Sequence, residues 1–222
     1  MHKIHLKKMV YIVALASISI VLALFEIPWF IPSGPFAAFL RLDFSEVAIL
    51  VAIVTLGYKD TSMVIILRSL VRLTYKGFPF DEAIGEFIAF SASFSIMFGF
   101  YITRRLLKKP LIPLFIEVPA MHEKLNAKLI ALYAVVISLT LSILMIVINY
   151  VVTTPLLLSY YGLFSTQLHL SVFTFIPDSE TFNFISFFIA VIVSYTPFNI
   201  VKALSVTLIF STIWPRLKYI EY

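Results

Sequence analysis

Residues Asn183–Trp214 read NFISFFIAVIVSYTPFNIVKALSVTLIFSTIW, a long apolar run with an Asn and a Lys near its middle. Asn199 and Lys202 are three residues apart, so both side chains lie on one face of a helix. An ammonium group inside a membrane-spanning helix is costly, and such groups usually serve a function. The segment therefore predicts a membrane-embedded site for a small polar molecule.

The composition of the whole chain is typical of a membrane protein. Of its 222 residues, 61% are hydrophobic and 13% are charged, whereas an ordinary soluble domain has roughly 25% charged residues. This length is enough for one helical bundle and no second globular domain. We expect an all-α integral membrane protein with a single domain over residues 1–222.

Several classes of function find no support in the sequence. The six glycines never form the spacing of a phosphate-binding loop. Cysteine is absent and the four histidines are scattered, so we expect no metal site. The net charge of +5 is explained by the loops between helices and requires no nucleic acid. No Ser/His, His/Glu or paired-carboxylate set lies deep in the apolar segments, so we do not expect an enzyme.

Six apolar segments are long enough to cross a bilayer alone or among neighbouring helices. Residues 183–195 fit either the outer half of the last helix, bent near Pro197, or a re-entrant or interfacial segment. Residues 104–126 are expected to form a linker between the fourth and fifth helices. The six predicted helices cover about residues 9–28, 43–57, 61–75, 81–103, 127–152 and 183–214.

The basic residues orient these helices across the membrane. Six crossings that start inside place twelve of the 17 Lys and Arg residues on the cytoplasmic side, as expected for short inner loops. Both termini and the linker are therefore predicted to be cytoplasmic, in a multi-pass protein of the cell membrane. The twelve residues are Lys3, Lys7, Lys8, Lys59, Arg104, Arg105, Lys108, Lys109, Lys124, Lys128, Arg216 and Lys218.

Polar side chains of two helices are expected to meet in the outer half of the membrane. At 1.5 Å per residue, Lys202 lies roughly 18 Å and Asn199 roughly 22 Å from the inner end of the last helix. Asn149, near the outer end of the preceding helix, lies at a similar depth, and Tyr195 and Phe36 are among the nearby aromatic residues. Amides between aromatic walls suit a planar heteroaromatic ligand. Each Asn alone also fits helix–helix hydrogen bonding.

A second set of charges lies in the third predicted helix, where Arg68 and Arg72 share a face. Carboxylates open the neighbouring helices, with Asp43 and Glu46 in the second and Glu86 in the fourth. We expect ion pairs among these groups, because charges inside membranes usually pair with one another. The alternative is an electropositive entrance that attracts a polar or phosphorylated ligand.

Small residues in the first helix allow another helix to approach closely. Ser19 and Ala23 are four residues apart and form a small-x-x-x-small step. This step predicts either packing inside the bundle or docking onto another membrane subunit.

Four stretches, in their order along the chain, resemble the substrate-binding (S) component of energy-coupling-factor (ECF) vitamin transporters, in the riboflavin-binding branch. The resemblance implies a six-helix S-component bundle with a vitamin pocket on the extracellular side. It also implies that Asn149, Asn199 and Lys202 contact the flavin ring. Leu40, Phe36 and Tyr195 are further expected substrate-binding residues, and the outer loop Trp29–Leu42 is expected to close over the ligand. The four stretches are LRLDFSE at 40–46, IGEFIAF at 84–90, Asn149-Tyr150 with Thr154-Pro155-Leu156, and PFNIVK at 197–202.

The resemblance implies a transport subunit that catalyses no reaction itself. Riboflavin would be the transported ligand rather than a cofactor, with FMN left open as a second ligand. A transmembrane coupling subunit and two ABC-type ATPases would be the partners that drive import. The alternatives are an S component for another vitamin (folate, thiamine or a pyridoxal-like compound) and a membrane assembly subunit without a ligand.

Overall fold

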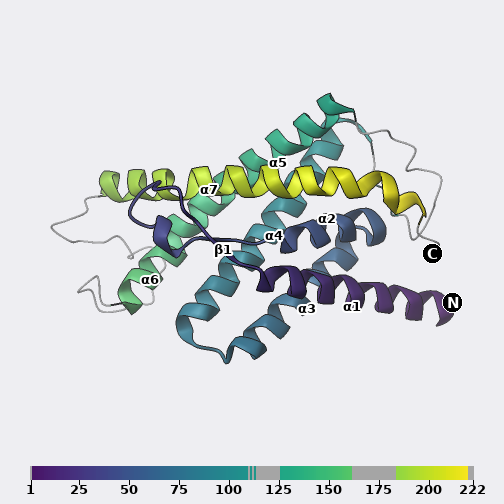
Figure 1. Cartoon of the computed structure of the whole chain (residues 1–222), viewed down its shortest axis with the longest axis horizontal. Coiled ribbons are helices and arrows are strands. Elements are labelled where there is room, and N and C mark those ends of the chain that lie inside the picture. The colour runs from purple at the N-terminus through teal and green to yellow at the C-terminus, as the bar shows by residue number, and fades with distance from the viewer. Residues whose placement is uncertain (1, 110, 112, 114–125, 162–183, 220–222) are drawn as a thin grey trace.

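In a computed structural model, the described part of the chain comprises residues 2–109, 111, 113, 126–161 and 184–219. These residues form an elongated helical bundle (Figure 1). Most of the predicted linker 104–126 and the first residue of the predicted last helix lie outside them. The helices are α1 (His2–Leu24), α2 (Ser45–Leu56), α3 (Tyr58–Lys76), α4 (Phe80–Leu106), α5 (Ala127–Ile148), α6 (Thr154–Tyr160) and α7 (Phe184–Ile213).

Four helical stretches of the described chain are long and apolar enough to cross a membrane. The other two predicted crossings correspond to α2 and α3. With 12 residues, α2 is roughly 18 Å long, which is short of a hydrocarbon core about 30 Å thick. The helix α3 carries several charges along its length. The four stretches are Leu6–Leu24, Phe80–Leu106, Ala127–Tyr160 and Ile185–Leu217.

The short helix α2 lies in the core of the bundle. Ile49, Leu50 and Ile53 are fully buried, and nearly every other residue of the helix is buried too. A helix that is apolar on all sides is stable only when other helices surround it. Accordingly, α1, α3, α4 and α7 all contact α2, whereas α5 packs between α4 and α7.

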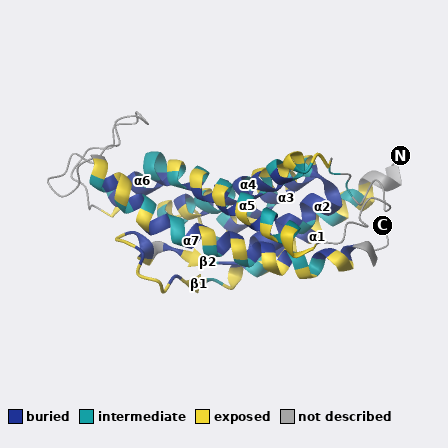
Figure 2. Cartoon of the chain, turned by 90° about the horizontal axis from the view of Figure 1, so that it is seen from above, coloured by how far each residue is buried: buried dark blue, intermediate teal, exposed yellow. Residues whose placement is uncertain are grey.

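The outer helices present apolar side chains to their surroundings, as the exposed positions in Figure 2 show. Val13 of α1, Leu139 of α5 and Ile185 of α7 are each more than half exposed. Soluble monomers rarely expose apolar surface on this scale. Helices can span lipid because they satisfy their backbone hydrogen bonds internally. The bundle is therefore that of a membrane protein.

The small face of α1 is used inside the bundle. Ser19 is fully buried, and its hydroxyl donates a hydrogen bond to the Ser45 carbonyl at 3.0 Å. Ala16 and Ala23 are also buried. Of the two interpretations of this face, internal packing against the start of α2 is the one observed.

A loop between α1 and α2 folds back onto α7. Its ends pair as two short antiparallel strands, β1 (Ile27–Pro28) and β2 (Arg41–Leu42), and a 3-10 turn, Ala37–Phe39, lies between them. The Ser33 hydroxyl donates to the Ser194 carbonyl at 3.2 Å, and the Phe36 N–H donates to the Ser194 hydroxyl at 3.2 Å. Both hydrogen bonds thus attach the loop to the same residue of α7, Ser194.

The last predicted helix is found as one continuous helix, whereas the fifth extends beyond its predicted end. Residues 184–213 form one helix with Pro197 inside it, so 184–195 are the first half of α7 and not a separate segment. The fifth stretch does not end at 152, because a π-helical turn, Asn149–Thr153, connects α5 to α6. Pro155 lies in the first turn of α6, directly after the π-helical turn.

Candidate ligand-binding site

A cavity of about 280 Å³ lies between the α1–α2 loop and the helices α3, α4, α5 and α7. Small-molecule sites usually measure roughly 300–1,000 Å³, so this cavity is close to the lower end of that range. The N-terminal end of α1 and the C-terminal end of α7 share one end of the molecule, and the α1–α2 loop, which lines the cavity, lies away from that end (Figure 1). The cavity is lined by Glu26, Ala38, Leu40, Arg41, Asp43, Arg72, Lys76, Asp81, Glu82, Gly85, Ile88, Ala89, Ala92, Met145, Asn149, Leu157, Tyr161, Tyr195, Phe198, Asn199 and Lys202.

Most of the residues that the sequence singles out lie at this cavity. The exceptions are Phe36, Glu46, Arg68 and Glu86, which do not line it. Phe36 stacks on Tyr195 with ring centroids 6.4 Å apart and supports the aromatic wall from outside. Those that do line the cavity are Leu40, Asp43, Arg72, Asn149, Tyr195, Asn199 and Lys202.

Lys202 lies in a buried ion-pair cluster. Its Nζ is 3.2 Å from Asp43 Oδ2 and 3.2 Å from Glu46 Oε1. Arg68 Nη1 lies 4.0 Å from the same Glu46 oxygen and donates to the Ser45 hydroxyl at 3.3 Å. A buried charge is tolerated only when it is paired and hydrogen-bonded. The sequence placed Lys202 on a ligand and expected Asp43 and Glu46 to pair with the arginines of the third helix; both carboxylates instead lie nearest to Lys202.

Asp43 also shapes the start of α2. Its Oδ1 accepts the backbone N–H of Ser45 at 2.9 Å and the hydroxyl of the same residue. The first N–H groups of a helix have no helical partner, and a side-chain oxygen just before the helix commonly satisfies one of them. One carboxylate therefore both starts α2 and faces Lys202 of α7.

A second network surrounds the opening of the cavity. Arg72 Nε lies 3.2 Å from Glu86 Oε2, and Arg72 Nη2 lies 3.3 Å from Glu26 Oε1. Glu26 also pairs with Arg41 at 3.1 Å, and Lys76 pairs with Glu82. The lining contains four acidic residues (Glu26, Asp43, Asp81 and Glu82) and four basic ones (Arg41, Arg72, Lys76 and Lys202). The formal charges cancel, which favours ion pairing over an electropositive entrance.

Asn149 opens the π-helical turn and is partly engaged by its own helix. Its Nδ2 donates to the Met145 carbonyl at 2.7 Å, and its Oδ1 accepts the Thr153 hydroxyl at 2.5 Å. A primary amide has two N–H donors and two acceptor lone pairs. One donor and one lone pair of Asn149 are therefore left for a ligand. Turns of this type occur frequently at functional sites.

Asn199 is a polar side chain of the cavity with an unused donor. It is 4% exposed, and its amide nitrogen has no hydrogen-bond partner among the described residues. A buried donor without a partner costs about 1–3 kcal/mol. Such groups in native proteins call for an explanation, commonly a ligand or an ordered water molecule. The amide lines a cavity, so a ligand can reach it.

Aromatic groups form the wall beside these amides. The Tyr195 hydroxyl shares a hydrogen bond with Thr154 Oγ1 at 2.9 Å, which orients the ring. Phe198 packs edge-to-face against Trp29 of the loop, with centroids 5.4 Å apart. The loop residue Leu40 is buried at the same cavity. A flat ligand would therefore contact both α7 and the loop.

Sequence reasoning missed several residues of the site. Glu26, which pairs with three basic residues, could have been found as the acid between the apolar first helix and Pro28. Thr153 follows Asn149 by four residues, a spacing that brings side chains together on a helix. Ser194 has no sequence signal, since its role depends on how the loop folds. No group of His, Asp and Glu residues suited to a metal ion occurs in the part of the chain that the structure describes.

Comparison with solved structures identifies the fold. A structure described as the S component of a bacterial ECF transporter matches with a TM-score of 0.63 and 21% sequence identity, covering 97% of each chain. The fold of this chain is therefore that of an S component. No protein-family model matches the sequence.

Two curated proteins are similar along nearly the whole chain. The riboflavin transporter RibU of Streptococcus thermophilus is 25% identical over 215 residues, which are 96% of this chain and 84% of that protein. The riboflavin transporter FmnP of Bacillus subtilis is 26% identical over 214 residues, which are 96% of this chain and 92% of that protein. The resemblance stated from the sequence is thereby confirmed.

Proposed function

We propose that this chain is the riboflavin-binding subunit of an ECF-type, ATP-driven vitamin importer. The fold and the two similar riboflavin transporters support this proposal. The observation that carries it is the amide nitrogen of Asn199, which has no hydrogen-bond partner among the described residues and is buried, together with Asn149, at a cavity with aromatic walls.

The chemistry of riboflavin suits the donors and acceptors of the cavity. The pyrimidine edge of its ring system has one N–H donor between two carbonyl acceptors. Asn199 offers an unused N–H to a carbonyl, and Asn149 retains one donor and one lone pair. The ammonium of Lys202 has three N–H donors, of which Asp43 and Glu46 occupy two. The third remains for the ligand.

The α1–α2 loop is the proposed cover of the cavity. It lines one side through Leu40 and Arg41 and is attached to α7 at Ser194. The balanced charges around the cavity offer no excess of positive charge to a phosphate. Riboflavin is therefore the proposed ligand, and FMN is expected to bind less tightly.

The remaining features of the proposal concern the membrane and the partners. Six crossings, made by α1 to α5 and α7, would place both termini in the cytoplasm and the cavity toward the outside of the cell membrane. The short α2 and the charged α3 can cross because other helices cover their polar groups. A coupling subunit and two ABC-type ATPases would hydrolyse ATP and drive the loaded subunit through its transport cycle.

The first test is the visible spectrum of the protein purified in detergent, followed by a fluorescence titration with riboflavin. A yellow preparation or saturable quenching supports the proposal. Displacement by folate, thiamine or pyridoxal, with no effect of riboflavin, would assign the chain to another vitamin. A protein that binds none of these compounds would contradict the proposal and favour an assembly subunit.

A matched pair of variants tests the site itself. Asn199→Ala removes an amide nitrogen without a protein partner, so we expect an unchanged melting temperature and a Kd for riboflavin raised by about tenfold or more. Asn126→Ala removes the amide that caps α5 by accepting the Leu129 N–H at 2.8 Å. That variant should lose about 1 kcal/mol of stability and keep its riboflavin affinity. Wild-type affinity in Asn199→Ala would refute the assignment of this amide.

A further inference from the structure

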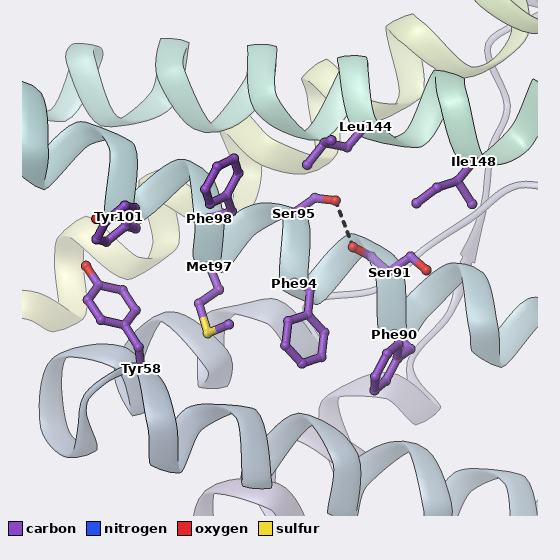
Figure 3. A pocket seen from close by; sticks show the side chains of 10 residues that line it. All are labelled: Tyr58, Phe90, Ser91, Phe94, Ser95, Met97, Phe98, Tyr101, Leu144 and Ile148. Carbon is purple, nitrogen blue, oxygen red and sulfur yellow. Dashed lines mark hydrogen bonds between the residues drawn. The ribbon is translucent and has the colours of Figure 1, made fainter.

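A second, larger cavity of about 600 Å³ lies on a different face of α4 from the candidate site (Figure 3). Its walls are almost entirely apolar and include Phe90, Phe94 and Phe98 of α4 and Leu144 and Ile148 of α5. Phe98 is 49% exposed, so the cavity is an open groove on the surface of the bundle. In a membrane protein such a groove faces lipid.

The groove has the length of one half of a bilayer. Its α4 residues extend from Phe90 to Tyr101, which is roughly 16 Å at 1.5 Å per residue. The hydrocarbon core of a bilayer is about 30 Å thick, so each leaflet contributes about half of that. One acyl chain of a lipid therefore matches the groove from end to end.

The groove continues into a basic pocket at one end. A cavity of about 300 Å³ shares Tyr58 and Tyr101 with the groove and is lined by Arg104, Arg105 and two lysines, Lys108 and Lys109. No acidic residue lines this pocket in the described part of the chain. The pocket lies where α3 begins and α4 ends. Four cations at the end of an apolar groove match a lipid with an anionic headgroup.

Polar groups at the junction leave donors available. Arg105 Nη1 donates to the Tyr101 hydroxyl at 3.1 Å, which holds the guanidinium beside the end of the groove. The Tyr58 ring lies edge-on to Tyr101 at 5.5 Å, and the Tyr58 hydroxyl is buried with no hydrogen-bond partner among the described residues. A phosphate oxygen placed here would accept hydrogen bonds that are otherwise unmade.

We propose that the groove and the basic pocket together bind one anionic phospholipid. Its acyl chain lies along Phe90, Phe94 and Phe98, and its phosphate contacts Arg105 and Lys108. Ser91 and Ser95 line the groove, and the Ser95 hydroxyl is satisfied by the Ser91 carbonyl at 2.8 Å, as the dashed line in Figure 3 shows. The groove is thus almost entirely apolar where the acyl chain of the lipid would lie, and the charged side chains are gathered at the pocket for its headgroup.

The test compares two lipids with the same acyl chains by native mass spectrometry of the full chain in detergent. We expect one phosphatidylglycerol molecule per protein, bound at least tenfold more tightly than phosphatidylcholine. Arg105→Gln with Lys108→Gln removes two exposed charges of the pocket and should weaken phosphatidylglycerol binding roughly 10- to 30-fold. The control pair, Lys59→Gln with Lys128→Gln, removes the same charge from exposed positions that do not line the pocket. It should leave binding unchanged.

A second variant tests the groove independently of charge. Ser91→Leu places a larger side chain in the acyl channel and should abolish the binding of phosphatidylglycerol as well. Equal binding of the two lipids, or equal losses in the two charge variants, would overturn the proposal. Full lipid binding in all variants, combined with impaired transport, would assign the surface to a protein partner instead. Riboflavin affinity, measured on the same samples, should not change. A negative result for lipid binding would therefore be distinct from a negative result for the proposed riboflavin binding.

Discussion

Replacing Lys202 by methionine should destabilise the protein strongly, because the change leaves two buried carboxylates without their nearest cation. Lys202 Nζ is 3.2 Å from both Asp43 Oδ2 and Glu46 Oε1. Glu46 is 0% exposed, and Arg68, at 4.0 Å, would be its remaining cation. Breaking a buried ion pair from one side costs about 3–5 kcal/mol. At roughly 2–4 °C per kcal/mol for a chain of this size, we expect the melting temperature to fall by roughly 6–20 °C.

A double variant separates the charge from the packing. Lys202→Met with Glu46→Gln removes one charge of each sign, so at least half of the lost stability should return. The control is Lys76→Met, the same substitution in an ion pair near the surface, where Lys76 and Glu82 are 23% and 42% exposed. That change should cost at most about 1 kcal/mol. Thermal unfolding of the detergent-purified proteins, without ligand, measures all three variants.

The same variants decide whether Lys202 also contacts the ligand. In the stabilised double variant we expect riboflavin to bind more than tenfold more weakly, because the third ammonium donor is gone. A single variant that melts within about 2 °C of the wild type, or a double variant no more stable than the single one, would refute the ion-pair argument. Wild-type affinity in a folded double variant would refute the ligand contact alone.

Three glycines give further predictions. Gly99→Ala would place a methyl group 2.9 Å from the Ile137 Cα, where α4 meets α5, and should cost about 1–3 kcal/mol in thermal unfolding. Gly85→Ala, where no atom lies within 4 Å, should be neutral or stabilising by at most about 1 kcal/mol, and equal losses at both sites would contradict the close approach. Gly34 has φ +127° and no room for a Cβ beside Ser194, so Gly34→Ala should displace the loop. A fluorescence titration should then show riboflavin binding weakened by about tenfold, from a strain of about 1–3 kcal/mol; unchanged affinity would show that binding does not need this contact.

The apolar segments could be predicted from the sequence because membrane helices need long runs of apolar residues. Helix ends and continuity could not, because they depend on local hydrogen bonding that composition does not report. Thr153-Thr154-Pro155 resembles a helix end, yet a π-helical turn carries the chain through it to Tyr160. For the last helix the sequence left two interpretations open, and the structure matches the first of them, a single helix of 30 residues that contains Pro197. The short α2 was identified by its apolar run, although its length falls below that of an ordinary crossing.

The residues of the site were easier to predict than the side chains with which they form ion pairs and hydrogen bonds. An intramembrane lysine marked the right place, but its carboxylates are Glu46 of α2 and Asp43 just before that helix, the latter 159 residues away. They meet Lys202 only because α2 packs against α7. The two carboxylates therefore offset the cost of burying the Lys202 ammonium, so a buried charge at this position is by itself weak evidence for a ligand. Asn199 lies one turn earlier on the same helix. Unlike the Lys202 ammonium, its amide nitrogen has no hydrogen-bond partner among the described residues. We infer that the charge cluster holds α2 and α7 together beneath the cavity, whereas the two amides carry most of the recognition.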